Sequence, residues 1–257
     1  MTNLRLTVEY DGTDFCGFQW QPESRTVAGV LAGAFGQLFG EPVKVTGAGR
    51  TDSGVHASGQ VVSFKTEASF PFERLLVALR GSLPPDCSAR DAALVDDDFS
   101  ARFSACERTY VYAILNRLQP SALLARYAYH HPQALDLTAM RAAAAALVGE
   151  RDFRSFCAAP PESTIRSLRR LAIEPHGELI RIEVAADGFL RHMVRTIVGT
   201  LTEIGTGRRD PAEIGSILAA RDRAAAGGLA PAQGLYLAGV RYTGGYDSFA
   251  EPPLLGR

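Results

Sequence analysis

Apolar and polar residues alternate along some stretches of the chain and recur at helical spacing in others. Residues 4–10 alternate between apolar and polar side chains, which predicts a half-buried strand. Residues 27–38 repeat apolar side chains every three or four positions, and Gly40 is placed to end that predicted helix. By the same criteria, we expect further strands at residues 43–46, 60–65, 88–94, 108–115, 168–174, 179–185 and 235–242. Further helices are expected at residues 72–79, 138–148, 189–204 and 211–220.

Strand–helix–strand–strand units occur twice along the chain. This order predicts an α+β fold with two ferredoxin-like lobes whose sheets are antiparallel. The first lobe is expected over residues 1–115 and the second over residues 137–243, with a connector at residues 116–136. Residues 244–257 are expected to form a surface tail.

The composition is that of a soluble globular protein. Hydrophobic residues make up 46% of the 257 residues and charged residues 21%, which allows one or two domains with a sizeable core. No run approaches the roughly 20 apolar residues of a membrane span, and the first ten residues lack the apolar region of a signal peptide. The four cysteines are scattered singly without zinc-ligand spacing. We therefore expect a cytoplasmic protein with free thiols, no structural metal and no membrane association.

The charge balance leaves nucleic-acid binding open. A net charge of −1 argues against it, because proteins that bind phosphate arrays usually carry a basic excess. However, Lys44 and Lys65 are the only lysines among the 27 basic residues. The other basic residues are arginines, which grip phosphates at two points and stack on bases. Genomic base composition explains the arginines equally well, so local patterns have to decide.

The segment Gly49-Arg50-Thr51-Asp52-Ser53-Gly54 is the most unusual in the chain. Its glycines flank one arginine and one acid, so a tight turn can bring both side chains to one point. An ionised carboxylate can act as a covalent nucleophile, and a nearby arginine favours the ionised form. The commoner role of an Asp in such a loop is to cap a turn. A Walker phosphate loop is excluded because no Gly-Lys-Ser/Thr follows, and the third glycine of a dinucleotide loop would fall on Asp52.

An aspartic protease is a remote alternative for the same segment. Asp52-Ser53-Gly54 matches the Asp-Ser/Thr-Gly signature of that class, whose mechanism needs two carboxylates sharing one proton. The chain has no second copy, since Asp247-Ser248 is followed by Phe249. Arg50 would also oppose the shared proton.

Residues 49–57 resemble the signature of the tRNA pseudouridine synthase A family. Other blocks resemble the family in the same order, at residues 9–12, 17–21, 60–64, 99–105, 108–112 and 192–199. Two departures are Phe18, where the family commonly has Trp, and Ser53, where Ala is frequent. The resemblance implies isomerisation of uridine to pseudouridine in tRNA without cofactor or metal, and lobes joined around a central RNA-binding cleft.

The resemblance also implies roles for individual residues. Asp52 would be the nucleophile, Tyr110 would stack on the target uracil, and Arg195 would belong to an active-site ion pair. The target base must flip out of its helix, and Arg50 is expected to fill the vacated space and help keep Asp52 charged. Whether Asp52 attacks ribose C1′ or uracil C6 stays open.

Spacing on a strand and on a helix supports RNA contacts at other residues. Arg108, Tyr110 and Tyr112 share one face of the predicted strand and could form a stacking platform, although tyrosines packed in a sheet core are the commoner cause of such a pattern. Arg191 and Arg195 lie four residues apart on the predicted 189–204 helix. Like charges at that spacing are destabilising, so they would face anions unless they are ordinary surface arginines. Arg102, Arg108 and Arg191 are the further RNA contacts that we expect.

The expected partner is tRNA, at positions thirty-eight to forty of its anticodon stem-loop, bound by a homodimer. These expectations come from the resemblance. The alternative is a non-catalytic tRNA-binding module or chaperone, but a pure binder gains nothing from placing Asp52 among phosphates. The five histidines show no metal-ligand spacing, and His56 is expected to serve the structure of the loop.

Overall fold

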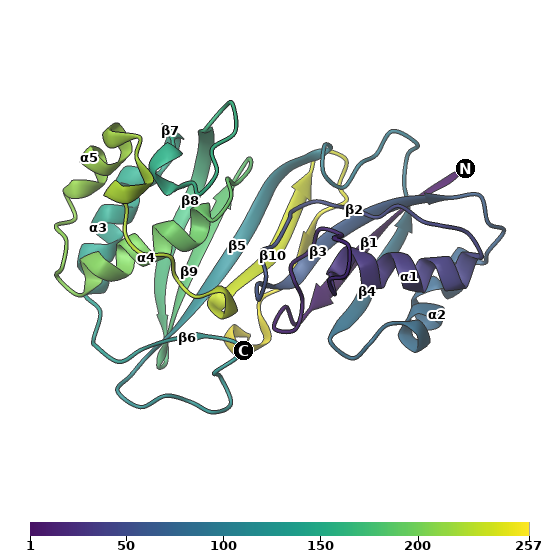
Figure 1. Cartoon of the computed structure of the whole chain (residues 1–257), viewed down its shortest axis with the longest axis horizontal. Helices are drawn as coiled ribbons and strands as arrows, with labels where there is room; N and C mark the ends of the chain where they lie inside the picture. Colours follow the sequence, from purple (N-terminus) through teal and green to yellow (C-terminus); the bar gives the residue numbers. More distant parts are fainter. Residues whose placement is uncertain (257) are drawn as a thin grey trace. The chain divides into compact units, whose positions relative to one another are not determined.

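The computed structural model describes residues 1–256 and has an α+β fold, with five α-helices and a set of mostly antiparallel strands in the described chain. The residues divide into two units, which are described separately (Figure 1). The first comprises Met1–Arg108 and Tyr236–Pro252, and the second Thr109–Leu235 with the end of the chain from Pro253. This division differs from the predicted lobes, which placed residues 109–115 in the first and residues 236–242 in the second.

The sheet of the first unit runs in the order β4-β1-β3-β10. Its strands are β1 (Thr2–Tyr10), β3 (His56–Thr66), β4 (Cys87–Leu94) and β10 (Leu235–Tyr242). β1 is antiparallel to β3 and β4, whereas β3 and β10 are parallel. Two-residue strands extend it, β2 (Thr46–Gly47) against β3 and β11 (Ser248–Phe249) against β10. The predicted strand at residues 43–46 is thus wrong except at its last residue.

Two helices belong to the first unit. α1 (Val27–Phe39) begins after Thr26, whose side chain accepts from the N–H of Gly29, and ends at Gly40 with φ of 72° as predicted. Phe35 of α1 stacks on Phe64 of β3 with ring centroids 4.3 Å apart. α2 (Leu75–Ser82) follows a 3₁₀ turn at Phe72–Arg74 and packs beside β4. Both helices of the first unit therefore pack on its sheet, α1 against β3 and α2 against β4.

The strand expected at residues 4–10 is confirmed as part of β1, but the prediction that it is half-buried is wrong, because β1 is buried on both faces. Arg5 is only 9% exposed because it pairs with Asp91 at 2.8 Å and lies 5.8 Å from the ring of Tyr246. Tyr246 belongs to the predicted surface tail, which also forms β11 and buries Leu255. The tail prediction is therefore wrong, because residues beyond 244 cover parts of the core.

The sheet of the second unit runs in the order β5-β9-β8-β7. Its strands are β5 (Ala105–Asn116), β7 (Gly149–Asp152), β8 (Ile165–His176) and β9 (Leu179–Ala186). β7, β8 and β9 pair antiparallel, and the short β6 (Tyr129–His131) runs parallel to β5. The helices are α3 (Leu137–Leu147), α4 (Met193–Gly205) and α5 (Glu213–Ala220), and α3 packs on both α4 and β8 (Figure 1).

The long helix of the second unit begins later than predicted. α4 starts at Met193 because His192 has a left-handed backbone, with φ of 66°. Arg191 therefore lies in a turn before the helix, and the predicted helical spacing of Arg191 and Arg195 is wrong. None of the helices in the described chain is both long and apolar enough to cross a bilayer.

Candidate functional site

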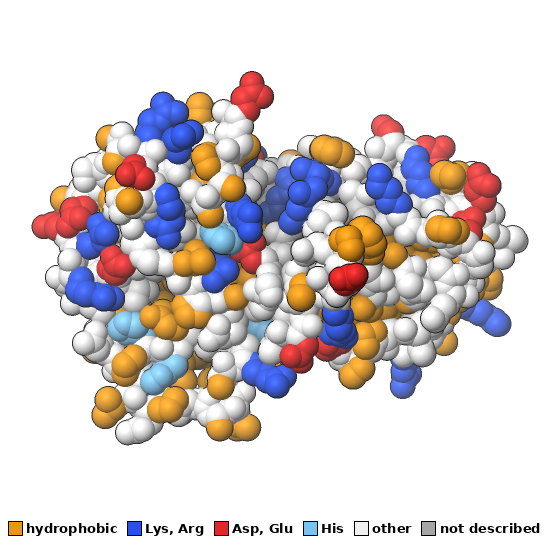
Figure 2. Space-filling view, viewed as in Figure 1, with side chains coloured by type: hydrophobic (Ala, Val, Ile, Leu, Met, Phe, Trp, Pro, Cys, Tyr) orange, Lys and Arg blue, Asp and Glu red, His pale blue; other side chains and the backbone are white. Residues whose placement is uncertain are grey.

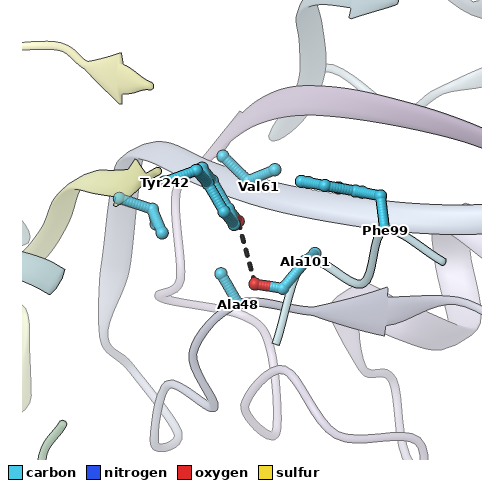
Figure 3. Packing of buried hydrophobic residues seen from close by; sticks show 6 residues of the cluster. Ala48, Val61, Phe99, Ala101 and Tyr242 are labelled. Atoms are coloured by element: carbon cyan, nitrogen blue, oxygen red, sulfur yellow. Dashed lines mark hydrogen bonds between the residues drawn. The ribbon is translucent and has the colours of Figure 1, made fainter. Parts of the chain in front are cut away.

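The loop that carries Asp52 starts from a packed apolar cluster in the first unit. Ala48 follows β2, donates its N–H to the carbonyl of Val61 at 2.8 Å, and is buried. It packs with Phe99, Ala101 and Tyr242, and the hydroxyl of Tyr242 donates to the carbonyl of Ala101 at 2.8 Å (Figure 3). The chain thus enters the loop from a position fixed by several strands.

Gln60 of β3 holds the next residue of the loop from both sides. Its side chain is fully buried; Oε1 accepts from the N–H of Gly49 at 3.2 Å and Nε2 donates to the carbonyl of Gly49 at 2.8 Å. The second hydrogen of Nε2 is directed to the hydroxyl of Tyr10 at 3.4 Å. Because buried backbone groups need partners, this two-point bond fixes the peptide units on both sides of Gly49, directly before Arg50.

Tyr10 of β1 holds the residue before Asp52. Its buried hydroxyl lies 2.9 Å from the hydroxyl of Thr51, which is also buried. Burial raises the pKa of Tyr10 well above its ordinary value, so this group stays a neutral hydroxyl. The carbonyl of Thr51 accepts from the N–H of Phe18 at 3.0 Å, and the carbonyl of Asp52 accepts from the N–H of Val55 at 3.1 Å. The backbone around Asp52 is thus bonded on either side of its side chain.

Two glycines let residues 11–18 approach the loop closely. A Cβ atom on Gly17 would lie 2.8 Å from the carbonyl oxygen of Thr51, and one on Gly12 would lie 2.0 Å from that of Val55. Gly17 also has φ of 87°, which disfavours any other residue. From this frame Arg50 projects as an exposed side chain and Asp52 as a half-buried one.

His56 has the structural role expected from the sequence. Its ring is buried and stacks on the ring of Tyr236, with centroids 4.8 Å apart. Nδ1 accepts a hydrogen bond of 2.9 Å from the backbone N–H of Gly12. Nδ1 also lies 3.2 Å from a carboxylate oxygen of Asp11. A backbone N–H can only donate, so Nδ1 is the acceptor in the bond with Gly12. That carboxylate oxygen accepts from the N–H of Thr13 at 3.0 Å.

Arg108 ties residues 102–105 to the start of the Asp52 loop. Its guanidinium donates to three backbone carbonyls, those of Ala48 at 3.2 Å, Ala105 at 3.0 Å, and Arg102. Arg102 is exposed and its guanidinium lies 5.2 Å from the ring of Phe103. Much of Arg108 is thus used inside the first unit, and its contact with RNA stays a prediction.

In the second unit, both tyrosines predicted for the platform are buried, Tyr110 with 7% of its surface exposed. Tyr110 packs edge-on against Phe189, with ring centroids 5.0 Å apart. Tyr112 is fully buried and donates its hydroxyl to the carbonyl of Pro231 at 2.7 Å. Its ring fills the space over Gly234, where a Cβ atom would lie 2.6 Å away. The core-packing alternative therefore holds for Tyr112.

Arg195 is fixed in the second unit by a reciprocal backbone contact. Its Nε donates to the carbonyl of Ala230 at 2.8 Å, and the N–H of Ala230 donates to the carbonyl of Arg195 at 3.1 Å. Arg195 is half-buried, whereas Arg191 is exposed. The sequence-predicted residues thus fall in both units, with Arg50, Asp52, Arg102 and Arg108 in the first and Tyr110, Arg191 and Arg195 in the second.

Metal-ligand groups and surface charge are the remaining features that bear on the site. Residues 1–256 contain no group of three or more His, Cys, Asp or Glu arranged to hold a metal ion, and their four cysteines are free thiols. On the face shown in Figure 2, basic side chains are interspersed with acidic and apolar ones, in line with the net charge of −1.

Comparison with known proteins gives a consistent result. The family model described as tRNA pseudouridine synthase matches residues 6–104 and 143–243. The chain is 48% identical over 246 residues to a tRNA pseudouridine synthase A of Moorella thermoacetica, covering 94% of this chain and all of that protein. The protein of the same name from Caldicellulosiruptor saccharolyticus is 44% identical over 244 residues, with the same coverage. That of Roseiflexus sp. is 45% identical over 261 residues, covering 98% of this chain and 96% of the relative.

Proposed function

The chain belongs to the tRNA pseudouridine synthase family, and from that membership we propose that it isomerises uridine in the anticodon stem-loop of tRNA, at positions thirty-eight to forty. In this isomerisation the C1′–N1 bond breaks and a C1′–C5 bond forms. The hydrogen on C5 leaves as a proton and N1 gains a proton. Atoms and electrons therefore balance without an oxidant, a reductant or a second substrate.

Asp52 is the proposed nucleophile. The observation that carries this proposal is the frame of its loop, in which Gln60 bonds both sides of Gly49 and Tyr10 bonds Thr51. A covalent nucleophile must be held in a reactive position before the substrate arrives, because misplacement by about 1 Å can cost about 100-fold in rate. A turn-capping Asp needs no such support from two distant strands. The attack is directed at ribose C1′ or at uracil C6.

The remaining site residues have proposed roles in binding the flipped nucleotide. A uridine inside a helical stem has to leave the stack before its C5 and C1′ atoms can react, at a cost of a few kcal/mol. The exposed Arg50 is proposed to occupy the vacated space and to favour the charged form of Asp52. Tyr110 is proposed to stack on the uracil, and Arg195 to support the active site. Arg102, Arg108 and Arg191 are proposed RNA contacts.

Two further proposals concern assembly and location. We propose a homodimer that binds each tRNA with both subunits, because one subunit with a net charge of −1 carries little basic surface for a molecule as large as tRNA. We also propose that it acts in the cytoplasm. Sedimentation at micromolar protein concentration tests the assembly. A dimer is expected, and a monomer that is fully active would contradict it.

Incubation with unmodified tRNA transcripts tests the proposed activity and its position. Pseudouridine should form at positions thirty-eight to forty of tRNAs that have uridine there, as read by mass mapping of nuclease fragments after carbodiimide labelling, because the unlabelled isomers have equal mass. A transcript with cytidine at those positions is the matched substrate control and should yield none. Binding of both transcripts without any pseudouridine would show the non-catalytic tRNA-binding module instead. Pseudouridine elsewhere in the tRNA would contradict the proposed position alone.

A further inference from the structure

Two arginines face each other across the strand pair β7–β8 in the second unit. In the antiparallel register Arg151 lies directly opposite Arg166, so both side chains leave the same face of the sheet. Like charges in this position destabilise a strand pair. The register of β7 and β8 therefore places two positive charges side by side, which lowers the stability of the free protein.

No carboxylate in the described chain forms an ion pair with either arginine. Arg151 Nη1 donates to the carbonyl of Glu150 at 2.9 Å. Arg166 Nη1 donates to the carbonyls of Ser163 at 3.2 Å and Ile165 at 2.6 Å. A carbonyl accepts a hydrogen bond but leaves the charge of the guanidinium in place, so both charges persist side by side.

The neighbouring arginines of the same sheet are treated differently. Arg170 on β8 and Arg181 on β9 both pair with Glu183, which is largely buried. The sheet thus neutralises arginines that lie further along its strands and leaves Arg151 and Arg166 without a carboxylate. This contrast indicates an anion from outside the chain.

Arg166 is linked to the ring of Tyr110 through two consecutive residues of the second unit, Gly188 and Phe189. A Cβ atom on Gly188 would lie 3.6 Å from Nε of Arg166, an ordinary van der Waals contact, so residue 188 lies beside this side chain. The next residue, Phe189, packs on Tyr110 with ring centroids 5.0 Å apart. An anion bound at the pair would therefore be a neighbour of the nucleotide whose base Tyr110 is proposed to stack on.

We propose that Arg151 and Arg166 bind a phosphate of the tRNA backbone beside the modified nucleotide. This site rests on the proposed function for the identity of its ligand. Guanidinium groups bind phosphate oxygens through two parallel N–H donors each, so two of them can hold one phosphate from two directions. The bound phosphate also removes the repulsion that the strand register imposes on the free protein.

The salt dependence of tRNA binding tests the site. Arg151→Gln, Arg166→Gln and the double variant are titrated with fluorescently labelled unmodified tRNA over a range of salt concentrations. Binding weakens as salt rises, so the slope of log K against log salt is negative. Loss of one phosphate contact should make this slope shallower by about 0.7–0.9 and weaken binding at low salt. Arg117→Gln is the matched control, because it removes the same charge from an arginine that is paired with Glu178 at 2.6 Å. It should leave the slope near that of the wild type.

The unfolding temperature separates binding from a structural role. Removing one of two facing arginines should leave the unfolding temperature of the free protein unchanged or raise it. Three results would each overturn the site. The arginine variants could keep the wild-type slope, or Arg117→Gln could show the same drop in slope as they do. Their weaker binding could also be explained by a lower unfolding temperature. Failure of the proposed function would give a different result. The wild type would then form no pseudouridine, while the salt dependence of tRNA binding would still be weaker in the arginine variants.

Discussion

The Asp52 loop and residues 117–128, the part of the predicted 116–136 connector that is called the connector from here on, are both irregular segments, but they are held in different ways. In the loop, side chains from β1 and β3 bond the backbone around Asp52, and none of these bonds joins near neighbours in sequence. In the connector, Arg117 pairs with Glu178 and its carbonyl lies 2.8 Å from Nε2 of His130, whereas the main-chain bonds that follow join near neighbours. Examples are those from the N–H groups of Tyr127 and Ala128 to the carbonyl of Leu124. Its Leu118 and Leu123 are 73% and 86% exposed.

Irregular backbone can hold a reactive side chain in place when regular strands hold that backbone. Local turns fix a segment only against itself, whereas bonds from strands fix it against the sheet. Catalytic groups need the second kind of support, because a side chain held to within about 0.5 Å depends on the groups behind it. The comparison predicts that changes behind the loop alter turnover strongly and changes in the connector alter it little.

The largest effect is expected at Gln60. In Gln60→Leu the N–H and carbonyl of Gly49 lose their buried partners, which should lower the free energy of unfolding by about 1–3 kcal/mol. The Arg50–Asp52 segment should also shift, and a shift of about 1 Å can cost about 100-fold in kcat. Steady-state kinetics on unmodified tRNA should show the loss in kcat, with the Kd for tRNA near that of the wild type.

Asn3 supplies a matched control for the loss of a buried amide. It is 3% exposed and donates to the carbonyls of Asp96 at 2.7 Å and Phe99 at 2.9 Å, in the same unit as Gln60. Asn3→Leu should lower stability comparably but keep kcat per folded molecule within a few-fold of the wild type. Equal losses of kcat in Asn3→Leu and Gln60→Leu would mean that Gln60 acts through stability alone.

The next effect is expected at Gly17. Alanine there adopts a strained backbone with φ of 87° and brings Cβ to 2.8 Å from the carbonyl of Thr51. We expect a loss of about 1–3 kcal/mol in the free energy of unfolding, measured in urea, and a lower kcat. Gly33→Ala within α1 meets nothing within 4 Å and should instead gain about 0.5–1 kcal/mol. A neutral Gly17→Ala would show that the loop tolerates displacement.

The smallest effect is expected in the connector. Leu118→Ser and Leu123→Ser replace exposed side chains and should change the free energy of unfolding by less than about 0.5 kcal/mol. Turnover on tRNA should stay near the wild-type rate. A loss of kcat as large as that of Gln60→Leu would break the comparison, because the connector would then also support the site.

The sequence was sufficient to predict elements whose signals are local. Gly40 ends α1 as expected, and residues 235–242 form β10 with the predicted bounds, because a helix stop and an apolar strand are written in neighbouring residues. The start of α4 was predicted too early, since the periodic apolar side chains continue through Leu190 although His192 breaks the helical backbone. The spacing of apolar side chains does not reveal a single residue whose backbone is left-handed.

The support of the site was harder to predict. Asp52 and Arg50 stand out because glycines surround them, but Gln60 lies eleven residues beyond Gly49 and is bonded to it only once β2 and β3 pair. The one available signal was an amide within an apolar strand, which needs a buried partner. Arg108 differs from Gln60, because its position on the strand predicted a contact with RNA. In the folded unit its guanidinium donates to backbone carbonyls.

The most direct test of the account is a single-turnover measurement on Asp52→Asn, with protein in excess over tRNA that carries tritium on C5 of uridine. Excess protein removes product release from the rate, and formation of the C1′–C5 bond releases the tritium to water. We expect a folded variant that binds tRNA as well as the wild type or better and releases no tritium above background, whereas Asp98→Asn at an exposed carboxylate should match the wild type. Tritium release and pseudouridine formed by well-folded Asp52→Asn protein, free of wild-type enzyme, would contradict this expectation.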